Sequence, residues 1–293
     1  MVVEPVIVAL LLLAALFHAT WNAILKSEGG DRLATFGVIM AMGVPMGAVL
    51  LPFLPPIQPE AWKYLATSVT IHLAYYYCLL KAYSYGDLSH TYPIARGLGP
   101  LLVALVSGRF LGEELRVQDI VGVLLLSGGL IALALPQRGA VQSGQRFGLA
   151  TLFAVLTGLT IAGYLVADGL GVRAAGPDFA HRLSYIAWLN VIEGPWLLVL
   201  AFARRPQATW TYVRTRWPRA AGGGAIAHTG YGIAIYAMAL GPLAHIAALR
   251  ETSVLFGALL GTLVLGEAFG RRRIAAAAVI VAGLVLMNGP RLY

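Results

Sequence analysis

The sequence predicts an all-α polytopic membrane protein, with ten transmembrane helices arranged as two inverted five-helix repeats. Three observations predict this fold: an apolar composition, ten apolar stretches of membrane-spanning length, and an internal repeat. Hydrophobic residues make up 59% of the chain, charged residues make up 12%, and the mean hydropathy is +0.77. A soluble domain carries about twice that share of charge. The composition therefore favours a chain that is solvated by lipid.

The ten apolar stretches occupy most of the 293 residues, so no room remains for a soluble domain of ordinary size. Each is close to the roughly 20 apolar residues that a bilayer-spanning helix needs. The first stretch lacks the basic residues that open a signal peptide, so we expect a retained helix. The stretches lie at 5–25, 33–54, 64–84, 91–111, 117–136, 147–168, 181–203, 220–240, 243–265 and 273–289.

The distribution of basic residues predicts the orientation of the chain in the membrane. Thirteen of the 21 lysines and arginines lie in the connections after the first, third, fifth, seventh and ninth stretches, against six on the other side. Cytoplasmic loops carry the excess of basic residues, which places both termini outside the cytoplasm. The same rule explains the net charge of +8 without any partner nucleic acid.

Several motifs recur in the same order about 155 residues apart, which predicts a repeat at 1–140 and another at 141–293. Five spans per repeat is an odd number, so the second repeat must enter the membrane in the opposite sense. Inverted repeats are characteristic of secondary transporters, which bind substrate near the midplane between the halves. The matched motifs are His72-Leu73-Ala74-Tyr75 with His228-Thr229-Gly230-Tyr231, Arg96 with Arg250, and Leu111-Gly112-Glu113 with Leu265-Gly266-Glu267.

Three segments carry a family resemblance: His18 to Lys26, Tyr92 to Gly97, and Leu265-Gly266-Glu267. They resemble EamA-type members of the drug/metabolite transporter superfamily, and the chain is similar to bacterial exporters of amino acids and related metabolites, aromatic amino acids among them. The resemblance implies a ten-helix basket in the inner membrane, with a central cavity lined mainly by the first four helices of each repeat. It indicates the superfamily far better than the substrate.

Ionisable residues inside a membrane are costly, so each is a candidate for function. Arg96 and Arg250 occupy matched positions in the fourth and ninth stretches, where a guanidinium can bind a substrate carboxylate in a bidentate fork. The alternative is a structural pairing with an acid such as Glu251. Both readings stay open at this point.

Two further groups of side chains are predicted to contact substrate. His72 and Tyr75, like His228 and Tyr231, lie three residues apart and so share one helix face, next to Tyr76 in the first repeat. Interhelical hydrogen bonding is the alternative role for these pairs. In the first stretch, one face carries His18, Trp21 and Asn22, a mixture of aromatic and polar groups that suits an amino-acid site.

Prolines and glycines inside the stretches predict kinks, each a possible hinge. Pro195 follows Glu193-Gly194, and Pro45 is its counterpart in the second stretch. Coupling to a proton would have to use Glu193, Glu251 or a histidine. Gly97-Leu98-Gly99-Pro100 is expected to interrupt the fourth stretch.

The chain has no G-x-x-x-x-G-K-[ST], no H-E-x-x-H and no C-x-x-C, so we expect no enzyme, cofactor or metal site. We expect an exporter of small metabolites, amino acids among them, that works by alternating access, is only weakly coupled and acts as a monomer. The alternative is a proton-coupled antiporter of cationic drugs, and an intramembrane enzyme is a distant third. An apparent shortage of buried acids argues mildly against the cation site.

Overall fold

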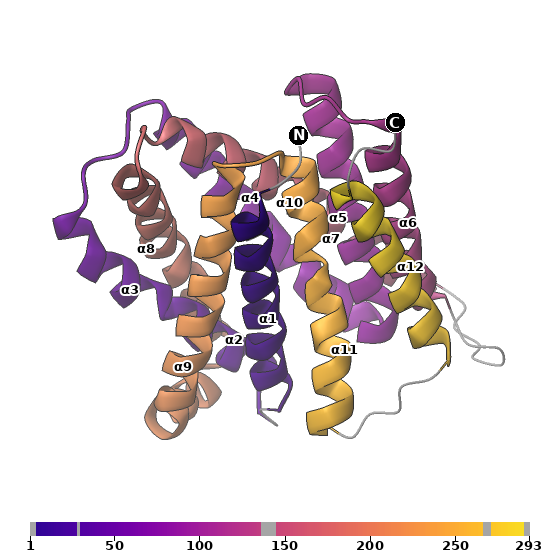
Figure 1. The fold of residues 1–293 in the computed structure, drawn as a ribbon. Helices are drawn as coiled ribbons and strands as arrows, with labels where there is room; N and C mark the ends of the chain where they lie inside the picture. The colour runs from indigo at the N-terminus through magenta and orange to yellow at the C-terminus, as the bar shows by residue number, and fades with distance from the viewer. Residues whose placement is uncertain (1–3, 28–29, 136–144, 266–270, 290–293) are drawn as a thin grey trace.

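The computed structural model describes residues 4–27, 30–135, 145–265 and 271–289, and within these ranges it contains helices and connections but no strand (Figure 1). The helices are α1 (Pro5–Ser27), α2 (Arg32–Ala41), α3 (Gly43–Leu50), the 3-10 helix η1 (Leu51–Phe53), α4 (Ala61–Tyr85), α5 (Leu88–Phe110), α6 (Val117–Ala134), α7 (Gln145–Ala174), α8 (Phe179–Arg204), α9 (Pro206–Met238), α10 (Leu243–Arg250), α11 (Thr252–Leu265) and α12 (Arg271–Asn288).

Each predicted stretch corresponds to one helix, except that the second and the ninth are each broken in two. The eighth, predicted at 220–240, is longer than expected, because α9 already begins at Pro206. Six segments of the described residues are apolar and long enough to cross a membrane, judged by length and composition. The helices α4, α5 and α9 are not among them. These three carry His72, Arg96 and Tyr231, polar residues that lie in the interior of the bundle.

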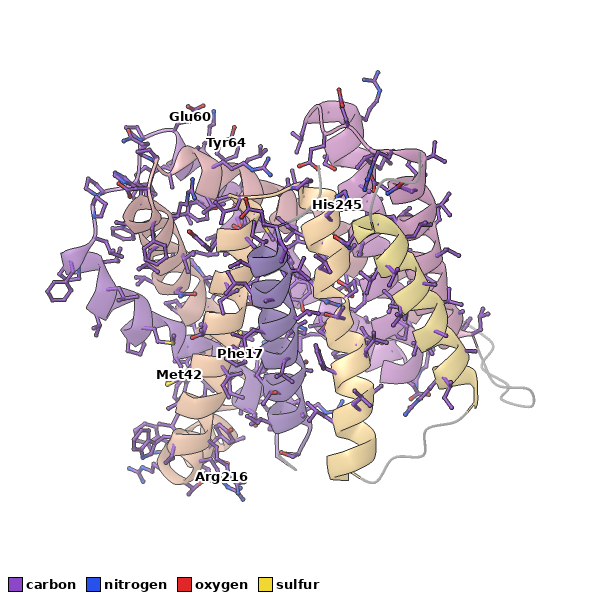
Figure 2. All side chains as sticks on the ribbon, in the orientation of Figure 1. Phe17, Met42, Glu60, Tyr64, Arg216 and His245 are labelled. Carbon is purple, nitrogen blue, oxygen red and sulfur yellow. The ribbon has the colours of Figure 1, made fainter. Side chains whose placement is uncertain are left out.

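The second stretch breaks at Met42, between α2 and α3 (Figure 2). Pro45 has no N–H to bond the carbonyl of Ala41, and its ring crowds that carbonyl, so the helix is interrupted one turn before the proline. The interruption lies where the sequence predicts a kink. By contrast α8 continues through Pro195, whose use as a hinge stays a prediction.

The predicted interruption of the fourth stretch is wrong, because α5 runs unbroken through Pro93 and Pro100. Gly97 instead lets α5 approach α6 closely: a Cβ at this position would lie 3.0 Å from the carbonyl oxygen of Ser127. The break occurs at the matched place in the other half, at Glu251 between α10 and α11. No proline or glycine marks that position in the sequence.

Helices from the first half of the chain pack in pairs against helices from the second half. The long helix α9 lies along α1, and α7 lies along α4; α8 packs against α2 and α3, and α12 packs against α6. The close contact of α6 with α12 depends on two facing glycines. A Cβ on Gly283 would lie 2.5 Å from the carbonyl oxygen of Gly122.

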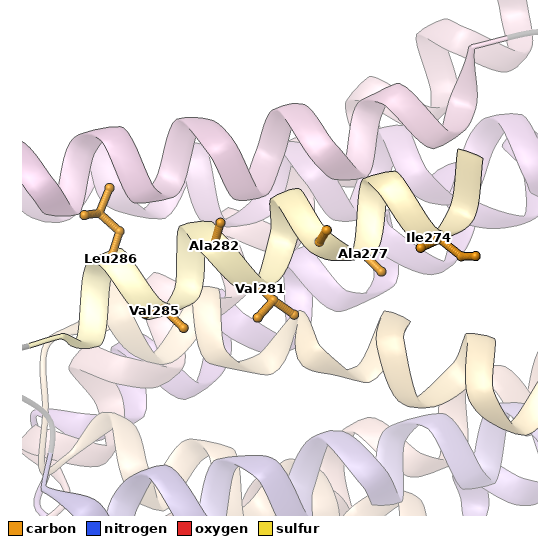
Figure 3. Close-up of a pocket in the computed structure, with 7 residues that line it drawn as sticks. Ile274, Ala277, Val281, Ala282, Val285 and Leu286 are labelled. Carbon is orange, nitrogen blue, oxygen red and sulfur yellow. The ribbon is translucent and has the colours of Figure 1, made fainter. Parts of the chain in front are cut away.

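The labelled residues locate the two ends of the bundle. The first residues of α1 and the last of α12 lie at one end, together with Glu60 and His245, whereas Arg216 lies at the opposite end (Figures 1 and 2). Around the sides, large apolar side chains remain exposed, as on α12. There Ile274, Val281 and Val285 line an open groove of aliphatic side chains that suits contact with lipid tails (Figure 3).

Candidate functional site

A group of buried and half-buried polar and aromatic side chains lies in the interior where the halves of the chain meet. The helices α4, α5, α7, α8, α9 and α10 all contribute to it, with Glu251 at the break after α10. We call this group the central cluster; it consists of His72, Tyr75, Tyr76, Arg96, Tyr164, Asp168, Glu193, Tyr231, Arg250 and Glu251.

Arg96 and Glu251 form a buried ion pair across the interface between the halves. The Arg96 Nε and Nη2 atoms donate to separate Glu251 carboxylate oxygens, each at 2.9 Å, and Nη2 also lies 3.3 Å from the Ser253 hydroxyl. Arg96 is 6% exposed and Glu251 2% exposed. The guanidinium of Arg96 is therefore already neutralised, which is the structural pairing considered from the sequence.

Arg250, the matched arginine, lies in a different environment. It is 8% exposed, its Nη1 is buried without a hydrogen-bond partner, and no carboxylate of the described residues pairs with it. Its guanidinium carbon lies 4.9 Å from the centre of the Tyr231 ring, a cation–π distance. Arg250, Tyr231 and His18 together line a cavity of about 10 Å³, room for about one water molecule.

Further aromatic rings pack next to Tyr231, which is one of the residues that line the cavity. His72 stacks on Tyr164 with 4.0 Å between ring centres, and the Tyr231 ring meets His72 edge-on at 5.9 Å. Tyr75 contacts Tyr164 edge-on at 5.6 Å. The sequence motifs predicted three of these residues, His72, Tyr75 and Tyr231, whereas Tyr164 lies in no repeated motif.

Asp168 is a member of the cluster that the sequence analysis did not single out. Its carboxylate is 0% exposed and accepts the Tyr231 hydroxyl at 2.5 Å and the Tyr185 hydroxyl at 3.0 Å. The available signal was an acid at the end of the sixth apolar stretch, a position that reads as a helix end near the interface. The supposed shortage of buried acids is wrong, since Asp119, Asp168 and Glu251 are all buried.

Glu193 completes the acidic part of the cluster. It accepts a hydrogen bond from the Tyr76 hydroxyl, and its other oxygen lies 3.9 Å from Nδ1 of His72. His72 itself meets the backbone carbonyl of Ser68 at 3.0 Å. Among the described residues, no group of three or more His, Cys, Asp or Glu side chains is placed to hold a metal ion.

The other predicted contacts lie around the cluster. His228 places its ring nitrogens 3.0 Å from the side-chain oxygen of Asn190 and 2.9 Å from the carbonyl of Met40, at the α2 break. Trp21 stacks on Phe36, and the Asn22 amide donates to the carbonyl of His18 one turn earlier. Of the first-helix face, His18 alone lines the cavity with Arg250.

The repeated Leu-Gly-Glu motif has a structural role in its first copy. Gly112 has a φ of 69°, a left-handed conformation that favours glycine. The turn it makes brings Glu113 to the start of α10, where the carboxylate accepts the N–H of Leu243 at 2.8 Å. Arg173 lies 3.6 Å from the same carboxylate. In the second copy, Gly266 and Glu267 lie outside the described residues.

Comparison with known proteins identifies the family. The family model described as the EamA-like transporter family matches residues 6–135 and again 148–289. The chain belongs to the EamA-like transporter family. This EamA-like protein is therefore a multi-pass membrane protein, a transporter of small molecules and not an enzyme.

Two relatives of the EamA-like chain extend the comparison. It is 30% identical to the uncharacterized protein PA1977 of Pseudomonas aeruginosa, over 92% of this chain and 89% of the relative. A crystal structure of a protein matches 96% of this chain and 94% of its own, with a TM-score of 0.71 at 18% identity. At that identity the second match shows the fold alone.

Proposed function

We propose that this protein exports small zwitterionic metabolites, amino acids with aromatic side chains among them, across the bacterial inner membrane. Transport proceeds by alternating access between two inverted halves, 1–140 and 141–293, with the substrate bound in the central cluster. The observation that carries the proposal is the unpaired guanidinium of Arg250 beside the cavity.

The hydrogen-bond partners of the charged groups in the central cluster favour a substrate with a carboxylate. Each of its buried acids already accepts a hydrogen bond: Asp168 from two tyrosines, Glu193 from Tyr76 and Glu251 from Arg96. Arg250 has no such partner among the described residues. A buried charge is costly when it is alone, so the substrate is expected to supply an anionic group. This comparison also disfavours a dedicated site for cationic drugs.

The aromatic rings of the central cluster, of which Tyr231 lines the cavity, favour an amphipathic or aromatic side chain on the substrate. Tyr231, Tyr164 and His72 offer faces and edges to a bound ring, and such pairs contribute about 0.5–1.5 kcal/mol beyond their buried area. Apolar walls with a few convergent polar groups are typical of small-molecule sites.

The packing of the helices supports the proposed inverted repeat. Exchanging the halves turns the α1–α9 contact into the α7–α4 contact, while the α2/α3–α8 and α6–α12 contacts map onto themselves. The histidines follow the same exchange. His228 meets Met40 in the helix before Pro45, and His72 lies beside Glu193 in the helix that contains Pro195. The family model also matches the chain twice.

The arginine-rich end of the bundle supports a cytoplasmic placement of that end, with both termini outside. Arg205 begins this region, next to the start of α9, and Arg216 lies at the same end (Figure 2). The positive-inside rule then assigns the end with Glu60 to the outside. A single chain is proposed to be sufficient for transport, because the central cluster is built from both halves of one chain.

Counterflow in proteoliposomes tests the proposal. Labelled phenylalanine, threonine and a quaternary-ammonium dye are offered to vesicles loaded with the unlabelled compound, and phenylalanine is expected to accumulate transiently. Arg250→Met is expected to raise the half-saturation concentration about 10- to 100-fold, because it removes charge-assisted hydrogen bonds of about 1.5–3 kcal/mol. Arg109→Met, at an exposed arginine of α5, is the matched control. Movement of the dye alone would refute the amino-acid proposal.

A further inference from the structure

The Tyr231 hydroxyl joins the cavity to a buried acid, a contact that the proposed function leaves unexplained. Its ring lies under Arg250 and lines the cavity, while its hydroxyl donates to Oδ2 of Asp168 at 2.5 Å. Tyr185 donates to the other carboxylate oxygen, Oδ1, at 3.0 Å. The fully buried Asp168 therefore connects to the cavity through a single hydroxyl group.

The direction of this hydrogen bond depends on the protonation of Asp168. While Asp168 is ionised, it only accepts, so Tyr231 donates and its own oxygen lone pairs stay available as acceptors. Donation to a carboxylate also makes the tyrosine oxygen a better acceptor. When Oδ2 takes up a proton, the acid donates to the Tyr231 oxygen, and the tyrosine hydrogen turns away from Asp168. Tyr185 still donates to Oδ1 in both states.

We propose that Asp168 binds the proton that is exchanged for substrate. While Asp168 is ionised, the Tyr231 oxygen accepts a hydrogen bond from the ammonium group of a zwitterion whose carboxylate is bound by Arg250. This inference rests on the proposed function. With Asp168 ionised, the site presents a cation at Arg250 and an acceptor at Tyr231, which match the carboxylate and the ammonium of an amino acid. With Asp168 protonated, one lone pair of the Tyr231 oxygen is occupied, its hydrogen is free to point into the cavity, and the site loses one negative charge, all of which disfavour a bound ammonium group.

Charged and titratable groups on four surrounding helices lie near Asp168, and their partners bear on which residue binds the exchanged proton. On α5, Arg96 is held by Glu251, and on α10, Arg250 faces the cavity. On α4, His72 faces both Asp168 and Glu193 and stacks on Tyr164 of α7, and Ser68 on the same helix donates to Asp168. On α8, Glu193 is bonded to Tyr76. Among these groups, Asp168 is the acid whose hydrogen bond reaches a residue that lines the cavity.

Binding of the proton and binding of the zwitterion therefore weaken each other. Such competition is the condition for antiport, whereas symport requires that both bind together. The empty site binds one proton from the acidic side and releases it when substrate arrives on the other side. No covalent bond forms or breaks apart from the O–H bond at Asp168. An inward proton gradient then drives export, so this inference replaces the weak coupling expected from the sequence.

The first test uses the unaltered protein and two probes. Phenylalanine and 3-phenylpropanoate, which lacks the ammonium group, are compared in counterflow between about pH 5.5 and 8, where both carboxylates stay ionised. Acidification is expected to raise the half-saturation concentration of phenylalanine, by at most about tenfold per pH unit for one competing proton. The value for 3-phenylpropanoate is expected not to rise. Equal responses of the two probes, or none, would overturn the proposal.

Two variants sharpen the assignment. Asp168→Asn is expected to lose the pH response and to move no protons, as read by a pH indicator inside the vesicles. Tyr231→Phe is expected to lose the preference for phenylalanine over 3-phenylpropanoate. Tyr185→Phe removes a hydroxyl from the same carboxylate but lies outside the cavity, so it is expected to keep that preference.

A full pH response in Asp168→Asn would overturn the proposal. If the variants do not fold, the two-probe comparison with the unaltered protein decides alone. Absence of any phenylalanine counterflow would instead refute the proposed function, whereas counterflow that ignores pH would refute this inference only.

Discussion

Removing one partner of the Arg96–Glu251 pair is the most quantitative test of the site. Glu251→Met leaves the Arg96 guanidinium buried with only the Ser253 hydroxyl beside it, in a cluster that already contains the unpaired Arg250. Breaking a buried pair in this way typically costs about 3–5 kcal/mol. Both carboxylate contacts are 2.9 Å, and both residues are more than nine-tenths buried, so we expect a loss in that range.

The double variant separates the ion pair from the packing around it. Replacing both partners by methionine leaves no lone charge at this position, and such replacements of buried pairs are often neutral or stabilising. Arg96→Met/Glu251→Met is therefore expected to regain most of the stability that either single variant loses. The free energy of unfolding is measured by denaturant titration in detergent for all four proteins, and the cycle gives the interaction energy.

A peripheral ion pair provides the matched control. Arg205 and Asp31 lie 3.1 Å apart with side chains 61% and 28% exposed, so Asp31→Asn is expected to cost no more than about 1 kcal/mol. Asparagine caps a helix as well as aspartate does, so the start of α2 stays capped. The stabilising role of the Arg96–Glu251 pair would be refuted if Glu251→Met cost no more than this control. It would equally be refuted if the double variant lost the sum of the single losses.

Three further variants test the roles assigned above by denaturant titration. Glu113→Gln removes the charge that caps α10 and is expected to cost about 1 kcal/mol; no loss would contradict the capping role. His228→Ala frees the carbonyl at the α2 break and is expected to cost about 1–3 kcal/mol, whereas weaker transport without destabilisation would assign it to substrate. Gly283→Leu is expected to cost about 1–3 kcal/mol by forcing α12 from α6, while Gly128→Leu, which has no neighbour within 4 Å, is tolerated.

The sequence predicted the helices because hydropathy and length are local properties of a membrane span. The break at Met42 was predictable in the same way, since Pro45 removes a particular backbone hydrogen bond. The break at Glu251 was not, because no residue there disfavours a helix. That break accompanies a contact between distant parts of the chain, the ion pair that Glu251 makes with Arg96.

The site residues that lie in the repeated motifs were predicted from the sequence, and those that lie outside the motifs were missed. The matched positions of Arg96 and Arg250 identified both arginines, but symmetry alone assigned them the same role. The following residue makes them different, because Gly97 stands where the second half has Glu251. Asp168 and Tyr164 belong to no matched motif, so their place in the cluster depends on how α7 packs against α4 and α9.

This single asymmetry has a consequence for a protein that must bind the same substrate from both sides. One carboxylate serves two matched arginines, so whichever arginine it neutralises, the other keeps its charge. In the described conformation Glu251 holds Arg96 and leaves Arg250 free. If the opposite-facing conformation transfers Glu251 to Arg250, then Arg96 becomes the free guanidinium. The central cluster would then retain one unpaired guanidinium for a substrate carboxylate in either conformation, whereas an exact repeat, with a glycine after both arginines, would leave two.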